Sequence, residues 1–367
     1  MPKQETADRA GMALALSGGG FRASLYHCGT IIRLNQLGLL TRLERISSVS
    51  GGSILAGMLA AAWPRLKTKD GVITNLEAEV IKPIQTFCTR NIDKYAFGFG
   101  AILPGVSVGD VLANLYDEMY GGITLQALPD KPQFLFNATN LQTGRLVRMH
   151  KVRLADYTIG EVPKPKIRLA VAVAASSAFP PVLSPVVIKL DPKSWKNREG
   201  TRHFGDPAFM AELSLTDGGA YDNLGLETVD DFAKVIVSDA GAPFSIDENA
   251  GTSMPKQLMR ALDIATDQSR GLRKRLLHAS RAGTTKTYAY AGIDGDVTRY
   301  PAPRKLSVDP ARVAGLARIR TRLDPFSAQE QGELINWGWF MTDVALRSHI
   351  DPAIPAPTKW LDPKWPL

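Results

Sequence analysis

The sequence contains few of the residues that build covalent or metal-dependent scaffolds. Its 367 residues include two cysteines, Cys28 and Cys88, which stand 60 positions apart and form no C-x-x-C pair. A disulfide framework needs more cysteines, and zinc or redox motifs use close cysteine pairs, so these classes are excluded. None of the five histidines has another four positions away, which excludes the H-E-x-x-H helix of zinc proteases.

The sequence also lacks a long hydrophobic run and an apolar leader. The longest nearly apolar run, residues 54–63, spans 10 residues, whereas a membrane-spanning helix needs about 18. The first 11 residues, MPKQETADRAG, have no apolar centre of the kind found in secretory signals. We therefore expect a soluble, cytoplasmic protein, with peripheral contact at the inner membrane surface left open.

The order of the predicted elements indicates an α/β fold. Apolar residues make up 44% of the chain, enough for a sizeable core. Residues 12–16 form an apolar strand that stops at three glycines, and Gly38 is the natural end of the helix that follows. Residues 46–49 form a second strand, followed at Gly51 by a helix of small residues. This alternation predicts a parallel sheet covered by helices on both faces.

Later strands are predicted at residues 134–139, 146–150, 213–216, 235–238 and 287–291. The chain beyond residue 254 otherwise has helical periodicity, and no Pro/Gly/Ser-rich linker precedes it. We therefore expect one core over residues 12–240 and a mostly helical C-terminal extension, residues 241–367, packed on it.

Ser50 lies in a predicted sharp turn between a strand and a helix. Ser48 stands two positions before it and Gly52 two after, which is the spacing of a nucleophile elbow, G-x-S-x-G in its usual form. Such a turn strains the backbone, so small residues must flank the serine. Its hydroxyl then lies at a helix N-terminus, where the dipole favours negative charge. The alternative is a Ser/Gly-rich N-cap turn without catalytic function.

Gly18, Gly19 and Gly20 directly follow the first predicted strand. With no Cβ in the way, their N–H groups can approach an anion. The loop is an oxyanion hole, where one donor contributes about 3–4 kcal/mol, or a phosphate cradle, or a tight strand–helix crossing. The Gly-Lys-Ser/Thr of an ATPase phosphate loop is absent, and Ala23 stands where the dinucleotide fingerprint G-x-G-x-x-G needs its last glycine.

Asp217 follows a predicted strand and precedes two glycines that allow another group to come close. A desolvated carboxylate held by backbone donors can accept the proton of a serine hydroxyl directly. His278 and His349 lie downstream, as in the Ser–acid–His order of other hydrolases, but neither follows a predicted strand end. The alternative for Asp217 is an ordinary Asp-Gly hairpin turn.

Together, these segments resemble the patatin-like phospholipases, in particular their cytosolic phospholipase A branch. The motifs occur in the family's order over the whole predicted core: GGGFRA at 18–23, SVSGGS at 48–53, NATNLQTG at 137–144, AASSAFPP at 174–181 and DGG at 217–219. The combination is specific, although each motif is weak by itself. The resemblance implies a three-layer α/β/α sandwich with a mainly parallel central sheet.

The resemblance also implies a Ser–Asp dyad without histidine, in which Ser50 is the nucleophile and Asp217 the base. It implies an oxyanion hole formed by the amides of Gly18, Gly19 and Gly20. No metal or organic cofactor is implied, because the dyad needs none.

Arg22 follows the glycine loop and is similar to the family arginine near the phosphate of a phospholipid substrate; a solvated arginine at a helix start is the alternative. Ser48 departs from the more common glycine but is small enough for the turn. The segment 174–181 is expected to form a buried helix that lines the acyl pocket, although packing alone would explain its composition.

Positive charge is concentrated near the C-terminal side of the chain. Residues 270–322 hold 13 Lys and Arg against three acids, whereas the whole chain has a net charge of +8. Five cations flank leucines 272, 276 and 277 in a predicted amphipathic helix: Arg270, Arg273, Lys274, Arg275 and Arg281. Such a helix suits an anionic membrane surface, where each cation contributes on the order of 1 kcal/mol. A solvated helical face is the alternative, and a nucleic-acid partner is disfavoured because no nucleic-acid-binding motif is present.

The sequence therefore predicts a serine acyl hydrolase that cleaves fatty-acyl esters of phospholipids or lysophospholipids. One alternative is a catalytically quiet or partner-gated effector or binding module with the same fold. A nucleotide-binding α/β protein is the other. A fluorophosphonate probe would label Ser50 only in the enzyme, whereas a mononucleotide would stabilise only the nucleotide-binding protein.

Overall fold

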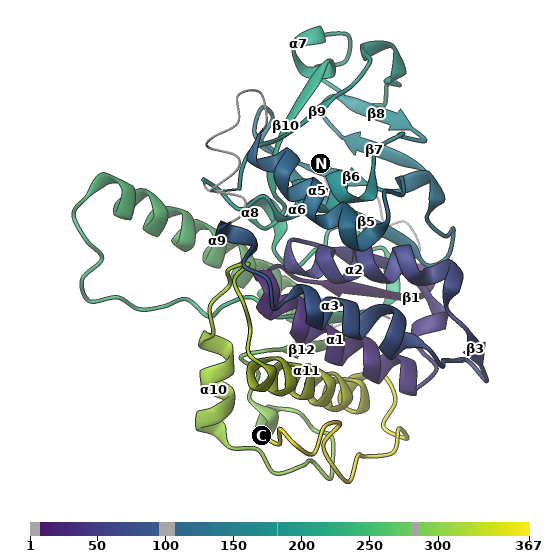
Figure 1. Cartoon of the computed structure of the whole chain (residues 1–367), viewed down its shortest axis with the longest axis vertical. Helices are drawn as coiled ribbons and strands as arrows, with labels where there is room; N and C mark the ends of the chain where they lie inside the picture. Colours follow the sequence, from purple (N-terminus) through teal and green to yellow (C-terminus); the bar gives the residue numbers. More distant parts are fainter. Residues whose placement is uncertain (1–7, 95–106, 182, 280–285) are drawn as a thin grey trace.

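The computed structural model describes residues 8–94, 107–181, 183–279 and 286–367, and all elements below lie within these ranges (Figure 1). Ten strands form one sheet in the spatial order β12-β11-β1-β2-β5-β6-β7-β8, with β10 pairing with β5 and β9 with β10. The strands are β1 (Arg9–Leu16), β2 (Leu43–Ser48), β5 (Gln133–Asn140), β6 (Arg145–Met149), β7 (Arg153–Asp156), β8 (Gly160–Pro163), β9 (Val186–Lys189), β10 (Glu212–Asp217), β11 (Phe232–Asp239) and β12 (Thr287–Gly292). A separate two-stranded hairpin joins β3 (Thr68–Lys69) and β4 (Val72–Ile73).

The five strands from β12 to β5 are parallel to one another. Beyond β5, the strands β6, β7 and β8 and the pair β10 and β9 are antiparallel additions. The predicted mainly parallel central sheet is confirmed, with an antiparallel extension on one side. Because β1 and β2 are parallel, their carboxyl ends meet at one edge of the sheet, where binding sites of α/β proteins form.

Residues on β1 show why the strand is central. Met12, Leu14 and Leu16 enter the main core, and Ala13 and Ala15 enter a smaller apolar cluster on the opposite face. A strand buried on both faces has a nearly continuous apolar sequence, as this one does.

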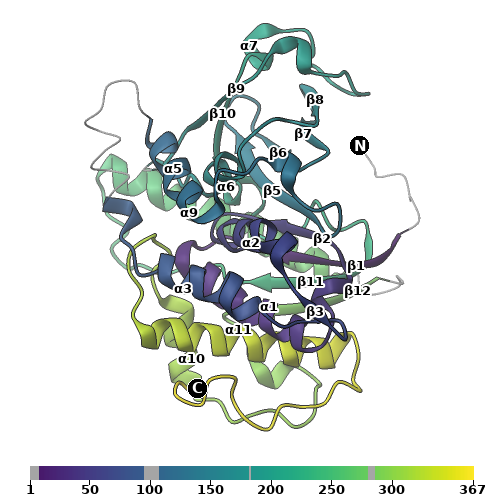
Figure 2. The same cartoon turned by 45° about the vertical axis from the view of Figure 1, so that its right-hand side comes forward.

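Helices cover both faces of the sheet, as predicted for an α/β/α sandwich (Figures 1 and 2). The helices are α1 (Gly20–Gln36), α2 (Gly51–Ala62), α3 (Lys82–Phe87), α5 (Val108–Tyr120), α6 (Leu169–Ser177), α7 (Pro207–Met210), α8 (Gly219–Asp222), α9 (Met254–Ala279), α10 (Pro310–Arg318) and α11 (Ala328–His349). Helices α1, α2, α6 and α11 contribute to the main core, and the end of α9 packs over the smaller cluster through Leu277.

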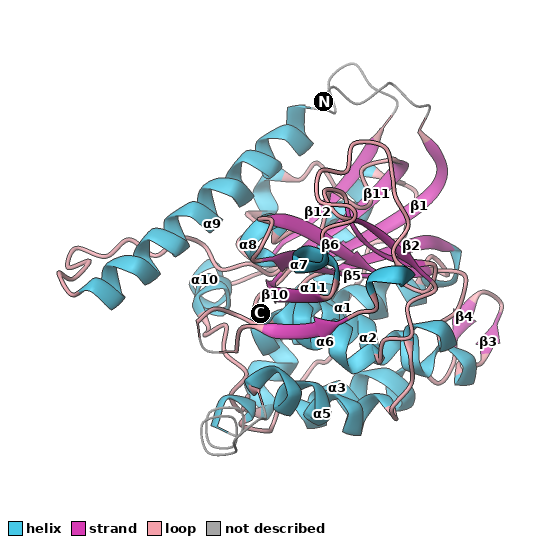
Figure 3. Cartoon of the chain, turned by 90° about the horizontal axis from the view of Figure 1, so that it is seen from above, coloured by secondary structure: helices cyan, strands magenta, loops and turns pink. Residues whose placement is uncertain are grey.

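Most of α9 projects away from the body of the protein (Figures 1 and 3). Within the described residues, no helix has the length and apolar character needed to cross a membrane.

The C-terminal residues take part in the same fold. β12 is a strand of the main sheet, and α11 packs along α1. A buried carboxylate links these two helices, because Asp343 of α11 accepts hydrogen bonds from Arg33 of α1 at 2.7 Å and from Arg347 at 2.8 Å. The domain boundary at residue 240 stays a prediction.

Candidate active site

Ser50 occupies the turn where β2 ends and α2 begins. Its φ of 51° and ψ of −122° lie in a region that non-glycine residues rarely adopt. The turn presses against the end of β1, because a Cβ on Gly52 would come within 2.6 Å of the Leu16 carbonyl oxygen. The strained backbone and the small neighbour that the spacing predicts for a nucleophile elbow are therefore both present.

Helix α6 holds the backbone of this turn. The Ser50 N–H donates to the carbonyl oxygen and to the Oγ of Ser176, each at 3.1 Å. The Ser176 hydroxyl donates in turn to the Asn137 carbonyl oxygen at 2.6 Å. Residues of segments 137–144 and 174–181 thus hold the backbone of the Ser50 turn. The predicted buried helix is observed as α6, which covers the first part of segment 174–181, and its place in an acyl pocket stays a prediction.

Strand β5 aligns Asp217 with Ser50. Ser48 of β2 pairs with Phe136, and Asp217 of β10 pairs with Ala138, two residues further along the same strand. The structure brings the two predicted residues together, because the Ser50 side chain is near enough to the Asp217 carboxyl group to lower its pKa.

The Asp217 carboxyl group has an unusual environment for an acid. Its side chain is buried, and its Oδ1 accepts the N–H of Gly219 at 2.7 Å. Burial raises the pKa of Asp217 to about 6, although the hydrogen bonds from Gly219 and Ser50 act in the opposite direction. A carboxyl group with this pKa is ionised at neutral pH and is a stronger base than an exposed aspartate.

The glycine loop lies against Ser50. A Cβ on Gly18 would come within 3.0 Å of the Ser50 Cβ. The Gly18 N–H donates to the Asn223 carbonyl oxygen at 3.0 Å, so this one of the three predicted oxyanion donors is already occupied. Among the described residues, the amides of Gly19 and Gly20 have no hydrogen-bond acceptor.

Gly51 is a donor that our sequence interpretation did not single out. Its amide follows the nucleophile at the start of α2, and no described residue accepts its hydrogen bond. The general elbow geometry, in which the residue after the nucleophile contributes to the oxyanion hole, was the available signal.

Arg22 is fully buried, so the alternative of a solvated arginine is wrong. Its guanidinium group donates to the carbonyl oxygens of Ala317, Ile319 and Ala240 at 3.0, 2.8 and 2.6 Å. It therefore ties the start of α1 to the C-terminal segment and to the end of β11. The predicted contact with a substrate phosphate stays a prediction.

His27 of α1 is separate from the Ser50–Asp217 pair. Its ring is hydrogen-bonded between the Ser238 hydroxyl at 2.7 Å and the Ser17 carbonyl oxygen at 3.0 Å. Burial lowers its pKa to about 4, so the ring is neutral at pH 7. The hydrogen bonds of His27 therefore link α1 to β11 and to the residue that joins β1 to the glycine loop.

Most cations of the predicted basic helix are paired inside the protein. In α9, Arg270 and Lys274 lie 2.7 and 3.2 Å from the buried carboxylate of Asp239. Arg273 pairs with carboxylates on α8 and in the loop after it. Arg281 lies outside the described residues. These pairs neutralise much of the charge that the sequence suggested for a membrane surface.

The outer face of α9 is apolar instead. Its exposed large side chains include Met254, Leu258, Leu272 and Leu276, whose spacing places them on one side of the helix. Leu272 and Leu276 are 52% and 60% exposed, whereas Leu277 is buried beneath them.

Comparison with known proteins supports the observed fold. Residues 14–230, more than half of the chain, match the family model described as "Patatin-like phospholipase". No curated protein sequence matches the chain.

Two solved structures of human GIVD cytosolic phospholipase A2 are similar in fold. One, in complex with methyl gamma-linolenyl fluorophosphonate inhibitor and terbium chloride, has a TM-score of 0.51 and 14% identity; the other has 0.50 and 12%. Each alignment covers 92% of this chain but 58% and 60%, respectively, of the human chains. The chain thus spans about three-fifths of their length, and the likeness concerns the fold.

Proposed function

Since the chain belongs to the patatin-like phospholipase family, a family of lipid-ester hydrolases, we propose that it is a serine acyl hydrolase using a Ser50–Asp217 dyad. Its proposed substrates are fatty-acyl esters of phospholipids or lysophospholipids. The observation that carries the proposal is the close approach of a strained elbow serine to a buried aspartate with a raised pKa.

In the first step, the Asp217 carboxylate accepts the Ser50 proton as Oγ attacks the ester carbonyl carbon. Gly219 holds Oδ1 of the carboxylate through its N–H, so the other oxygen is available for the proton. The raised pKa of Asp217 favours this transfer near neutral pH.

The tetrahedral intermediate carries a negative charge on the former carbonyl oxygen. Gly19, Gly20 and Gly51 supply the N–H groups for this oxyanion, because their amides have no acceptor among the described residues and lie at two helix starts beside Ser50. Asp217 then returns the proton to the leaving oxygen, so the alcohol or lysolipid departs and the carboxylate is ionised again. Asp217 next accepts a proton from the water that attacks the acyl-serine, and gives it to Ser50 as the fatty acid is released.

The apolar face of α9 is the proposed membrane contact. The helix projects from the body of the protein (Figure 3) and packs against α8, the short helix that follows Asp217. Exposed leucines on a projecting helix can enter the boundary between lipid head groups and acyl chains. Because Arg270, Arg273 and Lys274 are ion-paired, we expect this contact to depend weakly on anionic lipid.

A gated form of the same enzyme is the second candidate. Ser50 is only 8% exposed. A long acyl ester can therefore reach its hydroxyl group only when the site opens. The C-terminal segment also covers the loop, since the Phe21 N–H donates to the Arg322 carbonyl oxygen at 3.4 Å. A gated enzyme would label slowly at Ser50 without lipid and faster on vesicles.

Hydrolysis of a short p-nitrophenyl ester tests the proposal. We expect Ser50→Ala to lose activity by about 10⁴-fold or more and Asp217→Asn by about 10²–10⁴-fold. Ser47→Ala is the matched control, because Ser47 is also buried on β2 but its hydroxyl donates to the Gly225 carbonyl oxygen. Undiminished turnover in either dyad variant contradicts the proposed mechanism.

A further inference from the structure

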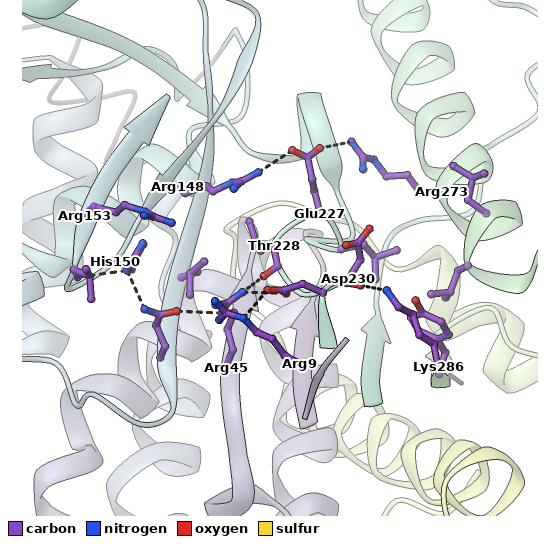
Figure 4. A pocket seen from close by; sticks show the side chains of 18 residues that line it. Arg9, Arg45, Arg148, His150, Arg153, Glu227, Thr228, Asp230, Arg273 and Lys286 are labelled. Atoms are coloured by element: carbon purple, nitrogen blue, oxygen red, sulfur yellow. Dashed lines mark hydrogen bonds and ion pairs between the residues drawn. The ribbon is translucent and has the colours of Figure 1, made fainter. Parts of the chain in front are cut away.

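A cavity of about 880 Å³ opens at the edge of the sheet where the parallel strands begin (Figure 4). Its lining residues include Arg9 at the start of β1, Arg45 near the start of β2, and Lys286 just before β12. Amino and carboxyl ends of parallel strands lie at opposite edges of a sheet. Arg45 is therefore roughly 10 Å along β2 from Ser48, the last residue of the strand, and Ser50 lies beyond that end. The cavity is therefore separate from the proposed active site.

Cations outnumber carboxylates in the lining of this cavity. The six cations are Arg9, Arg45, Arg148, Arg153, Arg273 and Lys286, and the three acids are Glu227, Asp230 and Asp231. Figure 4 shows these side chains converging from several strands and from α9 around one space.

The nearby carboxylates are shared between cations. The Glu227 carboxylate forms ion pairs with Arg148 at 3.0 Å and with Arg273 at 3.6 Å. Arg273 also forms an ion pair with a carboxylate on α8. The Asp231 carboxylate forms ion pairs with Arg9 at 3.3 Å and with Arg45 at 3.2 Å.

Glu161, which does not line the cavity, forms ion pairs with Arg153 at 3.3 Å and with Arg198 at 3.0 Å. Lys286 has its own partner, Asp8, at 3.0 Å. Arg9 and Arg45 thus share one carboxylate, as do Arg153 and Arg198, and this leaves positive charge that an anion would neutralise.

His150 adds a neutral hydrogen-bond donor to the cluster. Its Nδ1 accepts from Gln133 Nε2 at 3.3 Å and from the Val152 N–H at 3.4 Å, which places the ring proton on Nε2. Burial, followed by the charges of Arg153 and the other nearby arginines, lowers the pKa of His150 to about 4. Burial and neighbouring cations also lower the pKa of Arg153. These groups are therefore held together against their mutual repulsion.

The lining also contains apolar side chains, which include Leu135, Leu226, Leu276 and Tyr288. A bare inorganic anion would leave these side chains without a partner, whereas a ligand with a ring or an alkyl chain beside its charge would contact both the apolar and the cationic residues.

We propose that this cavity binds a small molecule that carries a phosphate group on an apolar or aromatic body. The planar guanidinium groups of Arg148 and Arg153, on the neighbouring strands β6 and β7, match the oxygen geometry of phosphate in paired hydrogen bonds. A soluble phosphate ester and the head group of an anionic phospholipid share this chemistry.

Calorimetric titration of the full chain with pyrophosphate, ADP and dihexanoylphosphatidic acid tests the proposal. We expect saturable binding of ADP or of the short lipid, tighter than that of pyrophosphate, and weakened at least about tenfold in Arg148→Gln and in Arg153→Gln. Tighter binding of ADP indicates a soluble phosphate ester, and tighter binding of the lipid indicates a head group. Arg198→Gln is the matched control, because Arg198 shares Glu161 with Arg153 but does not line the cavity.

Absence of binding by all three probes would overturn the proposal. Equal losses in Arg153→Gln and Arg198→Gln would also overturn it, as would nucleotide binding that survives both lining variants, because the glycine loop would then be the site. Thermal unfolding followed by circular dichroism verifies the fold of each variant. A failure of the Ser50–Asp217 dyad would not affect any of these binding results.

Discussion

Replacing Asp217 by asparagine should stabilise the protein while it lowers activity by about 10²–10⁴-fold. Asp217 is 4% exposed, and burial raises its pKa from 3.8 to about 6. The folded chain therefore binds this proton more tightly than the unfolded chain does. Between these two pKa values the free energy of unfolding falls as pH rises, and above pH 6 the full penalty applies.

The magnitude follows from the two pKa values. At about 1.4 kcal/mol per pH unit, the penalty at pH 8 is about 3 kcal/mol, and at pH 4.5 it is about 1 kcal/mol. Asparagine removes the charge but retains an oxygen that can accept the Gly219 N–H now bonded to Oδ1. We therefore expect Asp217→Asn to raise the free energy of unfolding by about 3 kcal/mol at pH 8 and about 1 kcal/mol at pH 4.5.

Urea unfolding followed by tryptophan fluorescence at both pH values measures this difference. Glu248→Gln is the charge-matched control, because Glu248 is exposed, and it should change stability little at either pH. A variant at residue 217 that is less stable than the wild type at pH 8, or a difference independent of pH, would refute the reasoning.

Three further predictions concern the surroundings of the dyad. Gly20→Ala should lower both thermal stability and fluorophosphonate labelling, because its Cβ would lie 1.9 Å from the Thr321 carbonyl oxygen; normal labelling would contradict the tight loop. Arg22→Lys should lower the free energy of unfolding, measured in urea, by about 3 kcal/mol, because lysine cannot reach all three buried carbonyls. An increase in KM for a phospholipid but not for a p-nitrophenyl ester would instead support the predicted phosphate contact. The double variant Leu258→Ser and Leu272→Ser should reduce co-sedimentation with neutral and anionic vesicles alike; unchanged sedimentation would contradict contact through α9.

The sequence was sufficient to predict the elements that create the site because local rules determine them. A strand ending in three glycines, and a serine turn between a strand and a helix, each have a pattern that sterics alone enforce. The predicted strand at residues 46–49 is observed as β2 (Leu43–Ser48), and the strand at 12–16 as β1 (Arg9–Leu16). The boundaries differ because pairing with neighbouring strands extends an element beyond its apolar centre.

The partners of the charged residues could not be predicted in this way. Arg22 binds carbonyl groups about 300 positions away, and Arg270 pairs with Asp239 on a different element. The Gly18 amide is occupied by a loop that follows Asp217. Such contacts depend on how distant segments pack, and no local pattern in the sequence encodes them.

The most direct test of the Ser50–Asp217 dyad is the rate and position of labelling by methyl gamma-linolenyl fluorophosphonate, followed by peptide mass spectrometry between pH 5 and pH 8. We expect a single adduct on Ser50, a rate that rises as pH passes about 6 because Asp217 becomes ionised, and loss of this pH dependence in Asp217→Asn. An adduct on another residue, or the same labelling rate and pH profile in Asp217→Asn, would contradict the dyad.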